Sequence, residues 1–414
     1  MRSMLCRLAI SFGLVVACSQ FTAAQEWTRF RGPNGTGISD AKSVPAQCTE
    51  KDYNWKVALP GIGHSSPVIW GDKIFLTSAI EDSCQRIVMC LNAADGGIVW
   101  QKVYDSTPHP KHLRSSFASS SPAVDADLVY VTWSAPDELI LAAFDHQGTE
   151  KWKKNLGPFK SMHSGGPSPV LYEDLVILGN DQDGVSSLVA LDRRTGEIRW
   201  QTPRRSDTVS YATPCVLKRE GQPPELIFNS GAHGITGVDP KNGKTNWELG
   251  VFDKRTVSSP VLAGGLVLGT CGSGAGGGYV VGLQPGSVDG KTPPQEVWRV
   301  KDQAPYVPTP VVKGDLVFLW SDKGVASCVK ADSGQMVWGP QRVGGNFSGS
   351  PVCVGDKLYC IAENGDVVVL AAGPEYQLLG RSPLGEDSRS TPAVSGGRMY
   401  LRSYSHLASL GGKK

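Results

Sequence analysis

A short turn that leads into a tryptophan recurs along this chain. In its clearest copy the apolar run Ser187–Leu191 predicts a strand, Asp192–Gly196 has the composition of a tight turn, and Trp200 follows on the returning strand. Aspartate can bond to backbone amides two residues on, and glycine adopts the positive φ that such turns need. The tryptophans that close this pattern are Trp55, Trp100, Trp152, Trp200, Trp247, Trp298 and Trp338. The regular recurrence of this turn and its tryptophan predicts a repeat architecture.

Each repeat opens with a small hydroxyl residue directly before a proline. The eight pairs follow one another at 41 to 55 residues and are Ser66-Pro67, Ser121-Pro122, Ser168-Pro169, Thr213-Pro214, Ser259-Pro260, Thr309-Pro310, Ser350-Pro351 and Thr391-Pro392. An apolar segment, usually a Gly/Asp turn, and a second strand come next, before the strand–turn–tryptophan unit. Four short strands per repeat, with no amphipathic helix, predict an all-β fold: a β-propeller of four-stranded antiparallel blades.

The two ends of the chain complement each other. The eighth repeat stops at Leu410 without a tryptophan strand, whereas Tyr53–Leu59 carries Trp55 and has no repeat before it. Joining the two completes one blade and leaves no exposed sheet edge between the first and last blades. We therefore predict an eight-bladed propeller over residues 53–414, closed by an N-terminal strand that completes the last blade. The tryptophans are expected to pack between blades.

Two repeats depart from the pattern. The fifth carries the glycine-rich insertions Gly272–Gly278 and Gly286–Pro294, which we expect to project from the ring. The first of them lacks the Lys-Ser/Thr ending and the following helix of a phosphate-binding loop. The seventh has Leu378-Leu379 where the tryptophan is expected.

The N-terminal 24 residues have the features of a signal peptide. Basic residues precede a short apolar run, Leu8–Ala17, which is too short to span a bilayer as a helix. Two processing routes stay open: cleavage after Ala24, or a lipobox, Val15–Cys18, in which Cys18 would be acylated. The next segment, residues 25–52, is rich in Trp, Phe, Arg and Gly, and we expect this arm to pack on the propeller.

Charge and cysteine usage narrow the function classes. The chain has 41 Lys and Arg against 39 Asp and Glu, a balance that argues against nucleic-acid binding. Eight cysteines follow the leader, most of them in apolar strands, which favours buried thiols, although Cys353 and Cys360 could face each other across a hairpin. His109 and His112 have no neighbouring carboxylate or cysteine, so no metal site is predicted.

The residues just before each Ser/Thr-Pro pair are the candidate binding residues. In a propeller the inner strands start where the connecting loops converge on the central channel, so these residues should surround a funnel mouth. They are His64, Arg114, Phe117, His163, Tyr211, Arg255, Tyr306, Asn346 with Phe347, and Arg389. Convergent polar and aromatic groups are typical of a binding site, and the arginines favour an anionic ligand. The alternative is that they pair with Asp302, Glu386 and Asp387 and only close the funnel.

The motif Ala190-x-Asp192-x-x-Thr195-Gly196-x-x-x-Trp200 resembles the pyrroloquinoline-quinone-like (PQQ-like) β-propeller repeat family. Looser copies are Asn92/Gly96/Trp100 and Asp239/Gly243/Trp247, and the arm segment Trp27–Gly37 looks like the start of uncharacterised exported members. The resemblance implies the fold and two functional branches. One branch is the quinone dehydrogenases, which bind PQQ with Ca²⁺. The other is the non-enzymatic propeller lipoprotein of the outer-membrane protein assembly machinery.

The chain lacks the adjacent cysteine pair of many quinone dehydrogenases, and no calcium-binding set is evident at the funnel positions. We therefore expect an exported, non-catalytic, monomeric scaffold without cofactor or metal. It would bind a protein partner or a small anionic ligand, in the periplasm or tethered to the outer membrane through Cys18. The alternative is a PQQ- and calcium-dependent dehydrogenase of alcohols or sugars. A polysaccharide binder that uses Trp27, Phe30 and Tyr306 is a third hypothesis.

Overall fold

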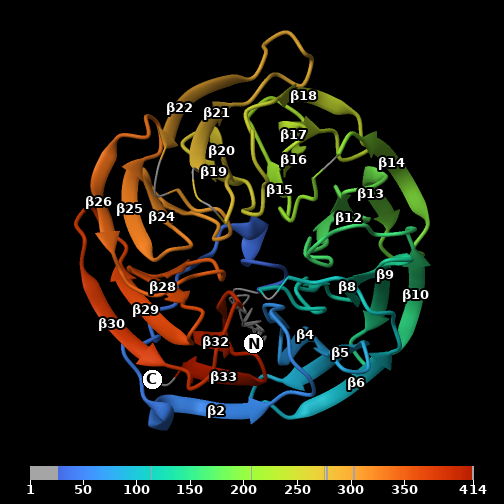
Figure 1. The fold of residues 1–414 in the computed structure, drawn as a ribbon, viewed down its shortest axis with the longest axis vertical. Helices are drawn as coiled ribbons and strands as arrows, with labels where there is room; N and C mark the ends of the chain where they lie inside the picture. Colours follow the sequence, from blue (N-terminus) through green and yellow to red (C-terminus); the bar gives the residue numbers. More distant parts are fainter. Residues whose placement is uncertain are drawn as a thin grey trace, which may run out of the picture.

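Eight antiparallel sheets stand around a central axis in the computed structural model of this chain, and together they form a β-propeller (Figure 1). The structure describes residues 27–412 except 113, 207, 275, 277, 302 and 303. The predicted signal peptide, with Cys18, and the predicted acidic partner Asp302 lie outside the described residues. The eight-bladed, all-β prediction is confirmed.

The first four blades each contain four strands, from the channel outward. They are β3 (Val68–Trp70), β4 (Lys73–Ile80), β5 (Gln85–Asn92) and β6 (Ile98–Tyr104); β7 (Ala123–Val124), β8 (Leu128–Ala135), β9 (Glu138–Asp145) and β10 (Glu150–Asn155); β11 (Val170–Tyr172), β12 (Leu175–Asn180), β13 (Ser186–Asp192) and β14 (Ile198–Arg204); and β15 (Cys215–Leu217), β16 (Glu225–Ser230), β17 (Gly234–Val238) and β18 (Thr245–Leu249). The two middle strands of a blade are almost continuously apolar because neighbouring blades cover both of their faces.

The last four blades follow the same order. They are β19 (Val261–Ala263), β20 (Leu266–Cys271), β21 (Tyr279–Gln284) and β22 (Gln295–Lys301); β23 (Val311–Lys313), β24 (Leu316–Trp320), β25 (Val325–Lys330) and β26 (Met336–Arg342); β27 (Val352–Val354), β28 (Lys357–Ile361), β29 (Asp366–Ala371) and β30 (Leu378–Pro383); and β31 (Ala393–Ser395), β32 (Arg398–Arg402), β33 (His406–Gly411) and β2 (Tyr53–Ala58). The short 3₁₀ turns η1 (Pro33–Gly35) and η2 (Glu50–Asp52) are the helices of the described part, and neither could cross a membrane.

An N-terminal strand and the last strand of the chain meet in the eighth blade, as predicted. Strand β2 pairs antiparallel with β33, and Trp55 lies opposite Ser409 (Figure 1). This pairing joins strands from the two ends of the chain, so the ring is sealed by backbone hydrogen bonds.

A closed ring of hydrogen bonds explains the Ser/Thr-Pro openings. The backbone N–H of each opening Ser or Thr donates to the side-chain oxygen of the corresponding residue in the next blade, at 2.9 to 3.3 Å. The series runs from Ser66 to Ser121, Ser168, Thr213, Ser259, Thr309, Ser350 and Thr391, and returns from Thr391 to Ser66. Only a short hydroxyl side chain can accept this bond so close to its own backbone, so the motif links all eight blades.

The tryptophans dock on the turn of the following blade. Trp152, for example, packs on Gly196, and its indole nitrogen donates to the carbonyl of Arg193 at 3.0 Å. The same bond is made by Trp55, Trp100, Trp200, Trp298 and Trp338. Trp247 differs: its buried indole nitrogen has no partner among the described residues, and its ring lies against Gly286 and Pro294 of the second insertion.

The arm lies inside the ring. Its first described residues contact the inner strands of several blades: the carbonyl of Trp27 accepts from Ile69 and that of Thr28 from Val124, both at 2.8 Å. Strand β1 (Ile38–Ser39) then pairs parallel with β27, so blade seven gains a fifth strand. Figure 1 shows this segment in blue at the centre of the ring. The arm therefore plugs the central channel before it leaves toward β2.

Two local expectations need correction or detail. The register places Cys353 opposite Leu358, not opposite Cys360, and all eight cysteines of the described part are free thiols. The loop between β21 and β22 projects from the rim of the ring (Figure 1). In the first insertion, Gly272 lies against the loop before β19, where its N–H donates to the carbonyl of Arg255 at 3.0 Å.

Candidate functional site

The candidate binding residues lie on one face of the ring, which we call the funnel face. In a four-stranded antiparallel blade, the loop that enters the inner strand and the loop between the second and third strands must lie on the same side. The opposite face carries the remaining turns, among them Asp192–Gly196. The arm closes the channel between the two faces.

The predicted residues before the inner strands of blades three to six form one cluster. The Arg255 guanidinium donates from Nη1 to Nε2 of His163 at 3.0 Å, and the ring of His163 lies 6.2 Å from that of Tyr211. The hydroxyl of Tyr211 bonds to Ser161 at 2.7 Å, and the side chain of Tyr306 also interacts with Arg255. His112, from the long loop between β6 and β7, stacks edge-on against His163 at 5.2 Å.

A second group forms on the other side of the funnel. Arg389 and Arg114 both pair with Glu363, at 3.5 and 3.8 Å. Arg389 also lies over the ring of Tyr404, which is in turn 5.3 Å from His64. Arg114 reaches Glu363 from the loop between blades one and two, so this pair spans the mouth.

The acidic partners differ from those expected. Glu363 pairs with the arginines, the role that was predicted for Glu386 and Asp387. Glu386 instead accepts hydrogen bonds from Ser403 and Ser405. Asp322 is a second carboxylate that sequence reasoning missed, and it accepts from the backbone of Tyr306 and Val307. Glu363, Asp322 and Tyr404 all lie in loops between second and third strands. Because strand direction alternates along each blade, the sequence could have placed those loops on the funnel face.

Three of the predicted residues do not join these groups. Phe117 is buried under the guanidinium of Arg86, 4.2 Å from its ring, and Phe347 packs on Trp320 in the core between blades. Asn346 is exposed and contributes its backbone carbonyl, which accepts from Glu363. Their position before the proline is shared with the others, but their side chains have different surroundings.

Burial and positive neighbours strongly perturb His64. Burial, followed by the charges of Arg389, Arg402 and Lys111, lowers the pKa of His64 from 6.5 to about 3. Below pH 6.5 the unfolded chain therefore binds a proton at His64, whereas the folded protein binds that proton only at about pH 3. Because the unfolded state binds more protons in that window, acid favours unfolding there.

Replacing His64 with glutamine should flatten the acid sensitivity of the protein. We expect the free energy of unfolding of the wild type to fall, relative to that of the variant, by up to about 1.4 kcal/mol for each pH unit below 6.5. Urea unfolding at pH 7.5, 6, 5 and 4 measures the difference. Glu386, whose pKa is lowered to about 2, is present in both proteins and cancels in the comparison. Parallel curves would contradict the assignment.

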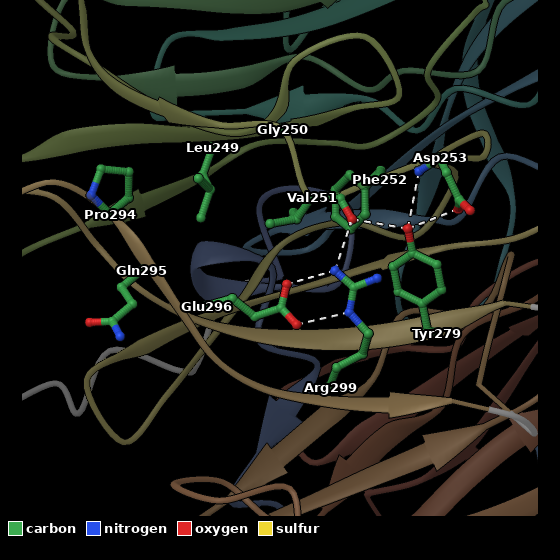
Figure 2. Close-up of a pocket in the computed structure, with 10 residues that line it drawn as sticks. All are labelled: Leu249, Gly250, Val251, Phe252, Asp253, Tyr279, Pro294, Gln295, Glu296 and Arg299. Carbon is green, nitrogen blue, oxygen red and sulfur yellow. Dashed lines mark hydrogen bonds and ion pairs between the residues drawn. The ribbon is translucent and has the colours of Figure 1, made fainter.

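A cavity of about 610 Å³ lies between blades four and five, against the start of the loop that leads from β18 to Arg255 (Figure 2). Leu249, Val251, Tyr279 and Pro294 line it, together with an ion pair in which Arg299 donates to both oxygens of Glu296. The pair is closed on itself, and Arg299 also stacks on Tyr279 at 4.2 Å. The charges of this ion pair are therefore already satisfied within the cavity.

The described residues offer no cluster of metal-ligating side chains at the funnel face. Calcium needs six to eight oxygen ligands, yet the described part contains no group of three or more His, Cys, Asp or Glu side chains that could hold a metal. The nearest carboxylates are engaged, Glu363 by two arginines and Asp322 by backbone amides. The Nδ1 of His109 lies 2.6 Å from the carbonyl of Pro110, and its Nε2 is buried without a partner among the described residues.

The glycan surface proposed from the sequence is wrong in one essential residue. Trp27 is completely buried in the channel, so its ring cannot stack on a sugar.

Comparisons with known proteins agree with the propeller fold. A family model described as "Outer membrane protein assembly factor BamB" matches residues 52–223, 222–339 and 286–402. The outer membrane protein assembly factor BamB of Yersinia pestis is 24% identical over 335 residues, which cover 78% of this chain and 76% of that protein.

Solved structures are similar in fold. BamB from Moraxella catarrhalis matches with a TM-score of 0.57 and 17% identity, over 86% of this chain and 97% of that one. The quinohemoprotein alcohol dehydrogenase ADHIIG of Pseudomonas putida HK5 matches with a TM-score of 0.64 and 13% identity, over 94% and 81%. Because both branches share the architecture, these structures speak for the fold alone. The family model, which spans most of the described ring, shows that the chain belongs to the PQQ-like repeat family of outer membrane protein assembly factor BamB.

Proposed function

We propose that this protein is an exported, non-catalytic scaffold that binds a partner protein of the cell envelope through its funnel face. One observation carries the proposal: two strongly exposed apolar side chains, Val185 at 90% and Met162 at 67%, stand on this face. Their loops are joined by a hydrogen bond from Asp183 to the carbonyl of Lys160 at 3.0 Å. Met162 directly precedes His163 of the funnel cluster.

This combination suits a protein interface. Exposed apolar groups beside arginine and tyrosine are enriched where proteins associate, and less so on free surface. The plugged channel leaves the funnel as a closed platform. The family and the Yersinia pestis relative carry the name of an outer membrane assembly factor. The predicted signal peptide agrees with an envelope location, and lipidation of Cys18 would add a tether.

Site-specific photo-crosslinking in cells of the source organism tests the proposal. A crosslinker at Val185 should form a discrete adduct with one envelope protein, identified by mass spectrometry, and Met162→Lys should weaken it. The matched control is Lys241, an exposed residue of a turn on the opposite face. Adducts at Lys241 without any at Val185 would overturn the choice of face.

The dehydrogenase alternative needs a separate assay. Saturating PQQ with Ca²⁺ should leave the melting temperature unchanged, and no dye reduction should follow addition of an alcohol or a sugar. A saturable stabilisation together with dye reduction would replace the scaffold with an enzyme.

A further inference from the structure

Arg255 differs from four other cations of the funnel face, each of which forms an ion pair. Arg114 and Arg389 pair with Glu363, Lys111 with Glu81, and Arg205 with Glu248. The contacts found for the Arg255 side chain within the described chain are with neutral groups. They are His163 and Tyr306, while its Nε is buried without a partner.

A backbone bridge fixes the position of Arg255 in its loop. The carbonyl of Arg255 accepts from Gly272 at 3.0 Å in an isolated bridge, and the ring of Tyr306 packs where a side chain on Gly272 would lie. His163 can accept from Arg255 only through an unprotonated Nε2, so the imidazole is neutral in this state. Among the described residues, the guanidinium thus has a defined direction and no ion pair with a carboxylate.

An apolar platform adjoins this charge. His163 follows Met162 in sequence, and Asp183 of the adjoining loop holds the backbone of Val209 at 2.8 Å, two residues before Tyr211. Met162 and Val185, the apolar residues of the proposed interface, therefore stand on loops that are linked to those of His163 and Tyr211.

We propose that Arg255, with His163 and Tyr306, binds a carboxylate of the partner protein, either an acidic side chain or a chain terminus, that lies beside an apolar residue. The inference rests on the proposed function. An arginine fork matches the two oxygens of a carboxylate, and charge-assisted bonds of this kind are about twice as strong as neutral ones. A lysine at this position would supply the charge without the fork.

Proton uptake by His163 on binding offers a second way to detect the site. Burial and the charges of Arg255 and His112 hold the pKa of His163 below its usual range, while Asp183 acts in the opposite sense. These charged groups and Tyr211 come from the four loops that face His163. A bound carboxylate would raise the pKa of His163, so binding should take up a proton and tighten as the pH falls from 7.5 to 5.5.

Calorimetric titration with two peptide probes tests the site: acetyl-Ala-Leu-Glu-Leu-amide and its glutamine counterpart. The glutamate peptide should bind the wild type about tenfold more tightly, and acetyl-Ala-Leu-Leu with a free carboxyl terminus shows whether a chain end serves equally. Arg255→Met should abolish the preference, Arg255→Lys should keep part of it, and Arg205→Met should leave it intact. Thermal melts verify that each variant is folded.

The outcomes separate this inference from the function on which it rests. Equal binding of the two peptides, or an undiminished preference in folded Arg255→Met, would overturn the carboxylate site, as would affinity that is independent of pH. If the Val185 crosslink then persists, the scaffold function stands without this site. If the Val185 crosslink is absent while the peptide preference is present, the proposed partner interface is wrong and the carboxylate belongs to another ligand.

Discussion

Replacing Arg31 with methionine should destabilise the propeller by about 3–5 kcal/mol, since several buried carbonyls would lose their donor together. The Arg31 side chain is completely buried in the channel. Its Nη1 donates to the carbonyls of Pro351 and Thr309 at 2.7 and 3.2 Å, and its Nη2 to that of Pro310 at 2.8 Å. These acceptors stand at the openings of blades six and seven. Burial lowers the pKa of Arg31 to about 9, so the guanidinium is still charged at neutral pH.

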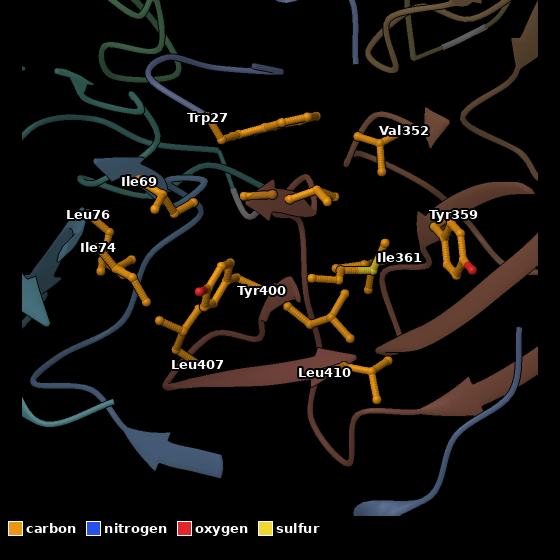
Figure 3. Packing of buried hydrophobic residues seen from close by; sticks show 14 of the residues in the cluster. Trp27, Ile69, Ile74, Leu76, Val352, Tyr359, Ile361, Tyr400, Leu407 and Leu410 are labelled. Atoms are coloured by element: carbon orange, nitrogen blue, oxygen red, sulfur yellow. The ribbon is translucent and has the colours of Figure 1, made fainter. Parts of the chain in front are cut away.

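The same substitution should loosen the arm. Trp27 lies over the apolar cluster that blades seven, eight and one share (Figure 3), and Arg31 is the polar half of the same plug. We expect limited proteolysis to cut within residues 27–52 of the variant, and urea unfolding to show an earlier midpoint. Lys42→Met, a change at an exposed arm residue, is the control. An unchanged midpoint and an intact arm would mean that the other arm contacts hold it without Arg31.

The repeat pattern predicted the ring well because each blade contacts mainly its neighbours. The tryptophan and the turn glycine that it needs are both visible in the sequence. Their pairing is the same at Gly96 and Gly148 as at Gly196, so one copy explains the others. Closure by Trp55 could be inferred from the missing strand after Leu410. Signals of this kind are local in sequence and do not depend on contacts between distant residues.

The arm and the funnel partners depend on contacts that no periodicity encodes. Arg31 and Pro351 are 320 residues apart in sequence, and Arg31 lies in the arm, outside the repeats. Glu363 was missed since the list of candidates came from the segments before the prolines alone. The prediction that Cys353 could face Cys360 is wrong because of the hairpin register. The two-residue turn at Gly355 places Cys353 opposite Leu358.

Gly196→Ala should cost about 3 kcal/mol, and Gly71→Ala only about 1 kcal/mol. Both glycines have positive φ, 73° and 58°, so both substitutions carry the penalty of about 1–2 kcal/mol for a left-handed residue. They also gain the same small benefit from a stiffer unfolded chain. A methyl group on Gly71 meets nothing within 4 Å, whereas one on Gly196 would lie 2.6 Å from the ring of Trp152. Overpacking of that kind adds about 1–3 kcal/mol.

The difference between the two variants therefore measures tryptophan docking itself, free of backbone strain. Urea unfolding of each variant gives the two costs. Repeating Gly196→Ala in a Trp152→Leu background completes a double-mutant cycle, in which the extra cost should disappear while that of Gly71→Ala persists. Equal costs in the wild-type background would mean that the indole shifts freely, and that the turn glycine is selected for its φ alone. The docking tryptophan would then stabilise the blade contact by its buried area and not by its fit.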